Sequence, residues 1–169
     1  MAIKNRRSIR AYSKEKIMNE ELEKLIDAMR WAPSAGNIQP WEFIIVSNTE
    51  IKHKISIAAL DQTFIEEAPI VIVVCANEKL SERGYSIRGK TLYCLQDTAA
   101  AIQNLLLAAY ALGLGTCWIG AFYEEEIRRI LDVPVGIRPV ALVPVGHPNE
   151  KPRTPQRRSI KDIVHYETF

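Results

Sequence analysis

The sequence has little of what marks several large classes of protein. Three cysteines occur among 169 residues, odd in number, far apart and in apolar surroundings: Cys75, Cys94 and Cys117. This pattern argues against a disulfide framework or a CxxC metal site, and it predicts buried thiols in a reducing cytoplasm. The formal net charge is only +2, so the chain lacks the basic excess of a non-specific nucleic-acid binder.

Long uninterrupted hydrophobic runs are also missing. The N-terminus lacks the apolar core of a signal peptide. The longest apolar stretch, residues 92–115, is interrupted by Gln96, Asp97, Gln103 and Asn104. One aspartate at the centre of a membrane helix costs about 2.5 to 3.5 kcal/mol on insertion. We therefore expect a buried helix in a soluble, cytoplasmic protein with no membrane segment.

Familiar catalytic motifs are absent as well. The sequence contains no P-loop, no GxSxG and no GxGxxG. His53, His147 and His165 have no partners at metal-ligand spacing, so we expect no metal site. An enzyme without an evident acid/base pair needs a cofactor that carries the chemistry itself.

What is present suits one globular domain covering residues 1–169. The chain is 47% hydrophobic and 25% charged, enough to bury a core. Periodicity and turn residues predict helices at 19–32 (with Asn19 as N-cap), 49–60, 92–112 and 124–131, strands at 41–47, 69–77 and 138–148, and a loop or lid at 78–90. The alternation favours an α/β or α+β sandwich with a sheet of four to five strands.

Arginines gather at both ends of the chain. The stretch "IKNRRSIRAYS", residues 3–13, contains Arg6, Arg7, Ser8 and Arg10, and the far end contains Arg153, Arg157 and Arg158. Guanidinium groups suit the bidentate capture of a phosphate or carboxylate. Each cluster alone is also typical of a solvated basic terminus. Together they suggest that the two ends meet over one anion.

Two glycine-bearing loops offer further polar groups. In "PSAGNIQPW", residues 33–41, Ser34, Asn37 and Gln39 sit on a backbone suited to reading the amide-like rim of a heterocycle, although a turn that satisfies its own backbone is an equal alternative. In "GTCWIGAF", residues 115–122, the glycines let backbone N–H groups approach a ligand. The alternative there is a strand that starts with a bulge.

Five ordered segments resemble the flavin-dependent nitroreductase family along nearly the whole chain: "RRSIRAY", "APSAGNIQPWEFIIV", "QDTAAAIQNLLLAAYALGLGTCWIGAF", "ALVPVGHP" and "RRSIKDIVHYE". The resemblance implies an α+β three-layer sandwich, with a central, mostly antiparallel sheet flanked by helices. It also implies an entwined homodimer that binds two FMN molecules at its interface.

The implied activity is that of an FMN-dependent NAD(P)H oxidoreductase. Such an enzyme takes electrons from NADH or NADPH and reduces nitroaromatics, quinones or similar small electron acceptors by ping-pong hydride transfer through flavin N5. Reductive dehalogenation and flavin fragmentation are alternatives within the family. A non-catalytic flavin carrier or sensor, and a basic-tailed module without a cofactor, are alternatives outside it.

The resemblance also implies roles for particular residues. Phosphate and ribityl contacts fall to Arg6, Arg7 and Ser8, and the cation near flavin N1 and O2 is Arg10. The edge of the flavin site that the partner subunit contributes is formed by Pro33, Ser34, Ala35, Asn37 and Gln39. The segment along the flavin is Trp118, Ile119, Gly120 and Ala121, with the backbone of Gly120 or Ala121 facing N5. The C-terminal phosphate clamp is Arg158 together with Arg157.

Three departures from the family pattern bear on these roles. Gln156 stands where many relatives have a lysine, and Gly120 where some have a glutamate. Only residues 61–91 are available to build the helical cover over the flavin. The identity of the electron acceptor therefore stays open.

Overall fold

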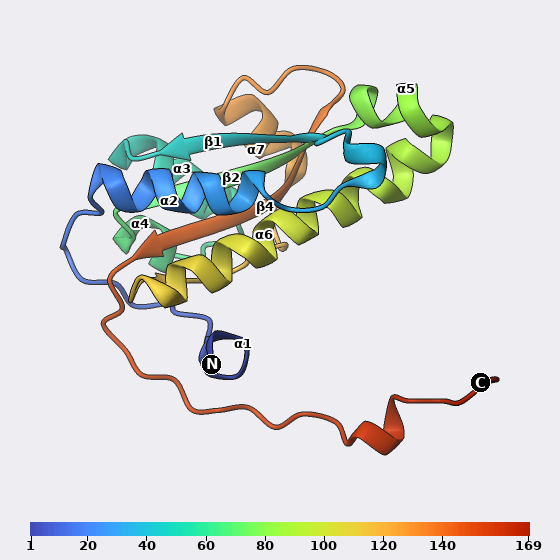
Figure 1. Ribbon diagram of the computed structural model, residues 1–169. Helices are drawn as coiled ribbons and strands as arrows, with labels where there is room; N and C mark the ends of the chain where they lie inside the picture. The colour runs from blue at the N-terminus through green and yellow to red at the C-terminus, as the bar shows by residue number, and fades with distance from the viewer.

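The computed structural model describes all residues from 1 to 169 (Figure 1). Its strands are β1 (Trp41–Val46), β2 (Ile70–Asn77), β3 (Gly115–Thr116) and β4 (Ile137–Gly146). Its longer helices are α2 (Asn19–Arg30), α3 (Thr49–Ala58), α5 (Glu78–Arg88), α6 (Cys94–Ala111) and α7 (Glu124–Ile130). Shorter pieces are α1 (Ala2–Asn5), α4 (Phe64–Glu67), the 3-10 turns η1 (Ala35–Asn37) and η3 (Ile160–Asp162), and the π-helical turn η2 (Gly89–Tyr93).

The sheet has the strand order β1-β2-β4-β3, and every neighbouring pair is antiparallel. Strand β2 lies in the interior of the sheet and is buried from Ile70 to Ala76. Helices cover both of its faces, which confirms the interpretation of the continuous apolar run at residues 69–77. A bulge between Val74 and Cys75 shifts the register against β4.

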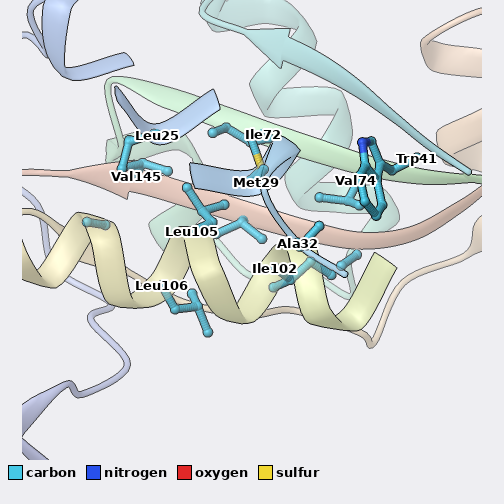
Figure 2. Close-up of a cluster of buried hydrophobic side chains, with 14 of the residues drawn as sticks. Leu25, Met29, Ala32, Trp41, Ile72, Val74, Ile102, Leu105, Leu106 and Val145 are labelled. Atoms are coloured by element: carbon cyan, nitrogen blue, oxygen red, sulfur yellow. The ribbon is translucent and has the colours of Figure 1, made fainter. Parts of the chain in front are cut away.

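Helices form one layer on each face of the sheet (Figure 1). Helices α2 and α6 pack on one face around a core that includes Leu25, Met29, Ile72, Val74, Ile102 and Leu105 (Figure 2). Helices α3, α4 and α7 pack on the other face around Ile55, Ile65, Val71, Val73 and Ile127. Alternate residues of β2 therefore enter opposite cores, as the two-residue period of a strand requires. The predicted α+β three-layer sandwich is confirmed.

Helix α6 runs along the sheet with one face fully buried. Its other apolar side chains, including Leu95, Ala99 and Leu107, are only partly covered, and its single charged residue, Asp97, is buried. The outer side of α6 therefore has apolar side chains and no charge. The helices of the structure include none with the length and hydrophobicity needed to cross a bilayer.

The sequence pattern at residues 78–90 predicts a loop or lid, and the structure has a helix there in place of a loop. Helix α5 fills this segment and passes through η2 directly into α6. The side chain of Asn77 caps α5 by accepting a hydrogen bond from the Leu80 N–H at 3.0 Å. The glycines that suggested a loop allow close packing: a Cβ on Gly84 would lie 2.3 Å from Ile38 Cδ1, and one on Gly89 2.2 Å from the Ser81 carbonyl oxygen.

Helix α2 begins one residue earlier than the predicted cap allows. Asn19 is its first helical residue and Met18 is the N-cap. The Glu21 carboxylate accepts a hydrogen bond from the Met18 N–H at 2.9 Å. The side chain that closes this end of the helix is thus the glutamate three residues after the cap, as in half of a capping box.

The C-terminal tail, residues 147–169, leaves the sheet after β4 and extends away from the body of the protein (Figure 1). No residue beyond Gly146 is buried. Its end nevertheless has large apolar side chains that are open to solvent: Ile160, Ile163, Val164, Tyr166 and Phe169. A single chain therefore leaves these side chains uncovered.

Candidate functional site

The N-terminal arginine segment is held along the edge of the sheet where β3 and β4 meet. The Ile9 N–H donates to the Thr116 carbonyl at 2.9 Å, and the Ser13 N–H donates to the His147 carbonyl at 2.9 Å. The Tyr12 hydroxyl is buried beneath the segment and donates to the Ile9 carbonyl at 2.6 Å. These contacts fix the backbone on both sides of Arg10.

The start of the C-terminal tail runs beside the same segment. The Asn149 N–H donates to the Ala11 carbonyl at 2.9 Å, and the Arg10 N–H donates to the Glu150 carboxylate. Further along, Arg7 Nη2 donates to Thr154 Oγ1 at 2.6 Å. The two ends of the chain therefore meet, as the paired arginine clusters suggested.

Between the two ends lies a pocket of about 260 Å³ that we call the arginine pocket. It is lined by Arg6, Arg7, Ser8, Arg10, Pro152, Arg153, Pro155 and Arg157. Its five guanidinium groups are drawn from both termini, and none of them forms an ion pair with a carboxylate of the chain. Guanidinium groups gathered without an ion-pair partner favour binding of an anion, and their geometry suits a phosphate.

Arg158 is not part of this lining. Its Nη2 donates to the Asp162 carbonyl at 2.6 Å, within the tail itself. Arg157, its neighbour in sequence, lines the pocket. Of the two arginines named for the clamp, the single chain thus brings only Arg157 to the other cluster.

The segment from Trp118 to Ala121 lies close to Arg10. Ile119 is fixed to β4 by reciprocal backbone hydrogen bonds with Leu142 at 2.9 and 3.0 Å. Its neighbours Trp118, Gly120 and Ala121 are exposed, and a Cβ on Gly120 would meet nothing within 4 Å. This backbone is therefore open to a ligand.

Gln62, just before α4, and Phe64, the first residue of α4, connect this segment to Arg10. Gln62 Nε2 donates to the Ala121 carbonyl at 3.1 Å. Two residues later, the Phe64 ring centroid lies 6.0 Å from the guanidinium carbon of Arg10. Neither residue belongs to a motif or a charge cluster that would mark it in the sequence.

The loop from Pro33 to Gln39 lies at the opposite end of the sheet. It leads into Trp41, which pairs with Ala76 of the neighbouring strand β2. Ala76 pairs in turn with Arg138 at the start of β4, so the loop lies at this end of the strands. The arginine pocket adjoins the other end of β4, near Gly146. Eight residues of strand separate the two ends, or about 26 Å. One chain therefore does not bring this loop to the arginines.

The loop has an unusual backbone that its own side chains maintain. Gly36, Asn37 and Gln39 have left-handed φ angles of 55°, 57° and 56°. The Ser34 hydroxyl accepts a hydrogen bond from the Gln39 N–H at 3.0 Å, and Gln39 Nε2 donates to the Asn37 carbonyl at 3.2 Å. Left-handed non-glycine residues are costly and cluster at functional sites.

Asp97 of α6 also holds this loop, and sequence reasoning missed it. Its Oδ1 accepts a hydrogen bond from the Ala35 N–H at 3.1 Å, while its buried Oδ2 has no partner. Burial raises the pKa of the Asp97 carboxyl. The signal for it in the sequence is an acidic residue inside an otherwise apolar helix.

The cysteines are all buried and unpaired, as predicted. Burial raises the pKa of Cys75 to about 12 and raises the pKa of the Cys94 and Cys117 thiols. The thiols stay protonated at neutral pH, so they are poor nucleophiles. No group of His, Cys, Asp and Glu side chains is arranged to hold a metal ion.

Comparison with known proteins decides the family. Residues 3–68 and 56–147 match the model of the Nitroreductase family. The chain belongs to the nitroreductase family. A protein of Archaeoglobus fulgidus whose name includes NAD(P)H nitroreductase is 40% identical over 153 residues, covering 88% of this chain and 84% of its own.

Two Bacillus subtilis proteins extend this comparison to nearly the full length of the chain. The relative named FMN reductase [NAD(P)H] is 32% identical over 185 residues, covering 99% of this chain and 73% of its own. The solved structure of the NfrA1 nitroreductase superimposes with a TM-score of 0.89 at 27% identity, covering 99% of this chain and 73% of that one. The fold and the sequence motifs thus lead to the same family.

Proposed function

We propose that the protein is an FMN-dependent NAD(P)H oxidoreductase that works as a homodimer in the cytoplasm, with residues 1–169 as one FMN-binding domain. The observation that carries this proposal is the arginine pocket, in which guanidinium groups from both termini converge without a carboxylate partner. A relative that covers nearly the whole chain is named FMN reductase [NAD(P)H]. FMN has the phosphate that such a pocket requires.

The residues of the chain fit the two ends of FMN. Arg6, Arg7, Ser8 and Arg157 would hold the phosphate and the ribityl chain. The exposed backbone at Gly120 and Ala121, which has space above it, would lie along the ring near N5. When bound, FMN supplies the site that accepts and donates hydride.

Arg10 has a separate role in this proposal. It lies beside Phe64, near the segment that would follow the ring, and no carboxylate pairs with its guanidinium. Such a cation near N1 and O2 favours the reduced flavin, because negative charge collects there on reduction. Trp118 and Ile119 would continue the surface beneath the ring.

The dimer supplies what one chain lacks. Pro33, Ser34, Ala35, Asn37 and Gln39 lie a sheet's length away from the arginine pocket. A second copy placed against the first would bring its own loop to the ring. The uncovered apolar side of α6 and the apolar end of the tail support such an interface.

No acid/base pair is evident in the proposed site, so the flavin itself would carry the chemistry. We propose ping-pong hydride transfer, in which NADH or NADPH reduces the flavin and leaves, and a nitroaromatic, a quinone or a similar small conjugated acceptor then takes the electrons. A single open face over the ring serves both molecules in turn.

One anaerobic experiment tests the function. The purified protein, loaded with FMN, is mixed with NADH or NADPH, and the reduced protein is then mixed with a nitroaromatic, a quinone and a haloaromatic compound. We expect the flavin absorbance to bleach with a donor and to return with an acceptor. Failure to bind FMN would contradict the whole proposal, and a bound flavin that neither donor reduces would indicate a carrier instead of an enzyme.

A further inference from the structure

The lid segment, α5 together with η2 (residues 78–93), has a cluster of side chains to which the FMN contacts assign no role. Tyr85 and Tyr93 pack edge to face, with ring centroids 5.2 Å apart and planes at 79°. Arg88 Nε donates to the Tyr93 hydroxyl at 2.9 Å, and the guanidinium carbon lies 5.3 Å from the Tyr93 ring centroid. Two aromatic rings and one guanidinium therefore form a single unit.

The Arg88 guanidinium is held in place but not neutralised. It forms no ion pair, and its terminal nitrogens have no hydrogen-bond acceptor in the chain. Lys90, two residues later, is paired with Glu82 at 3.5 Å. The lid segment as a whole has four basic and two acidic side chains. The unpaired guanidinium and the excess of basic over acidic side chains favour binding of an anion to this segment.

The cluster sits directly on the loop from Pro33 to Gln39. A Cβ on Gly36 would lie 2.5 Å from the Tyr85 hydroxyl, so the two segments are in close contact. The backbone at the next residue, Ser86, has φ 51° and ψ −144°, a region that non-glycine residues rarely occupy. The kink therefore separates Tyr85 from the helix that precedes it and leaves its hydroxyl against the loop.

This position determines what the cluster would meet. Under the proposed function the loop borders the partner subunit's flavin ring, so the lid segment that packs on the loop lies beside the molecule stacked on that ring. Tyr85 is 40% exposed and Arg88 is exposed, so both are available to it. Aromatic edges suit a flat ring, and a guanidinium suits a carboxylate or phosphate on it.

We propose that Arg88, oriented by Tyr93 and next to Tyr85, binds an anionic group on the flat molecule that lies over the flavin. The inference rests on the proposed function and adds a substrate class to it. Two molecules carry such a group in turn: an aromatic acceptor with a carboxylate, and NADPH with the 2′-phosphate that NADH lacks. Because the two half-reactions are separate in a ping-pong scheme, the acceptor and the donor can each be tested by themselves as the molecule that supplies the anionic group.

The test uses FMN-loaded parent protein and three variants, Arg88→Gln, Arg88→Lys and Arg83→Gln. Arg83 is the matched control, since it is an exposed arginine of the same helix that forms no hydrogen bond or ion pair through its side chain. In the oxidative arm, reduced protein is reoxidised by 4-nitrobenzoate or by the neutral 4-nitrobenzamide. In the reductive arm, oxidised protein is reduced by NADPH or by NADH.

We expect the parent to favour 4-nitrobenzoate, and Arg88→Gln to lower the ratio of the two reoxidation rate constants by about tenfold or more. Arg88→Lys should retain part of the preference, and Arg83→Gln should retain all of it. A loss confined to the NADPH-to-NADH ratio would support the same anion site and assign it to the donor.

Unchanged ratios in both arms for Arg88→Gln would overturn the inference. In that case a flavin that is still reduced by NADH or NADPH would leave the proposed function standing. A parent protein that fails to bind FMN, or whose flavin neither donor reduces, would contradict both. The two failures are thus distinguishable in one set of measurements.

Discussion

Arg157 and Arg158 are neighbours in the sequence, and the structure gives them different surroundings. Arg157 lines the arginine pocket, whereas Arg158 donates to the Asp162 carbonyl outside it. Both have the same chemistry and nearly the same distance from the end of the chain. The difference between them depends on how the tail lies against the N-terminal segment, which local sequence does not encode.

This difference predicts unequal effects on cofactor binding. Arg157→Ala should weaken FMN binding by about 1.5 to 3 kcal/mol, the scale of hydrogen bonds to charged groups. Arg158→Ala is the matched control and should have little effect. Riboflavin, which lacks the phosphate, should bind both variants like the parent. Calorimetric titration of the apoprotein with both flavins checks this, and equal FMN losses in the two variants would contradict the placement of Arg157.

At the scale of elements, the strongly patterned segments were the ones that could be predicted. The apolar run at 69–77 is β2, which is buried along nearly its whole length, and the apolar stretch ending before Gly113 is α6, which has one buried face. The lid segment could not be predicted in the same way. Gly84 and Gly89 are typical of a loop, but here the lack of a Cβ lets Ile38 and the Ser81 backbone approach them closely. Only the tertiary structure shows that reason.

The candidate site shows the same contrast between signals that are local in the sequence and contacts that only the tertiary structure creates. Each of its segments could be recognised in the sequence, because arginine clusters and glycine-bearing loops are local signals. Their assembly could not be recognised, since Arg7 and Thr154 are 147 positions apart when they meet. Strand order, which puts the loop from Pro33 to Gln39 at the far end of the sheet, depends on pairings of the same kind.

The contact between α6 and this loop predicts a pH dependence of stability. Burial raises the pKa of Asp97 above its ordinary value of 3.8, and the hydrogen bond from Ala35 opposes the shift. A raised pKa in the folded state means that Asp97 contributes stability below the unfolded-state pKa and loses it as the pH rises through the folded-state pKa. Asparagine keeps an acceptor for the Ala35 N–H and does not titrate.

The free energy of unfolding of the parent, relative to that of Asp97→Asn, should therefore fall as the pH rises from about 4 to about 7. Urea denaturation of both proteins across this range measures the difference. Asn104→Ala is a useful control, because Asn104 Nδ2 also ties α6 to another segment, the Ala28 carbonyl, at 3.0 Å, and does not titrate. A parent-to-variant difference that is the same at every pH would contradict the raised pKa.

At the scale of the whole molecule, one chain keeps apart the two segments that the proposed flavin site needs. The arginine pocket adjoins the end of β4, and the loop with left-handed residues adjoins the start of β1. The chain also leaves apolar side chains uncovered on α6 and at the end of the tail. A second copy would account for both observations, since it would complete the proposed site and cover the apolar surface.

This argument predicts a homodimer with an interface above about 2,000 Å² in total, the size of obligate interfaces. Light scattering on the full chain should give the mass of two copies, and a monomer with FMN bound would rule out the proposed arrangement. Removing residues 159–169 deletes the five exposed apolar side chains of the tail and retains Arg157, so it tests the tail separately from the phosphate contact. We expect this truncated protein to dissociate at protein concentrations where the full chain remains dimeric, because less apolar area is buried between the copies. Equal dimer affinities for the two proteins would remove the end of the tail from the interface and leave α6 as the surface that joins them.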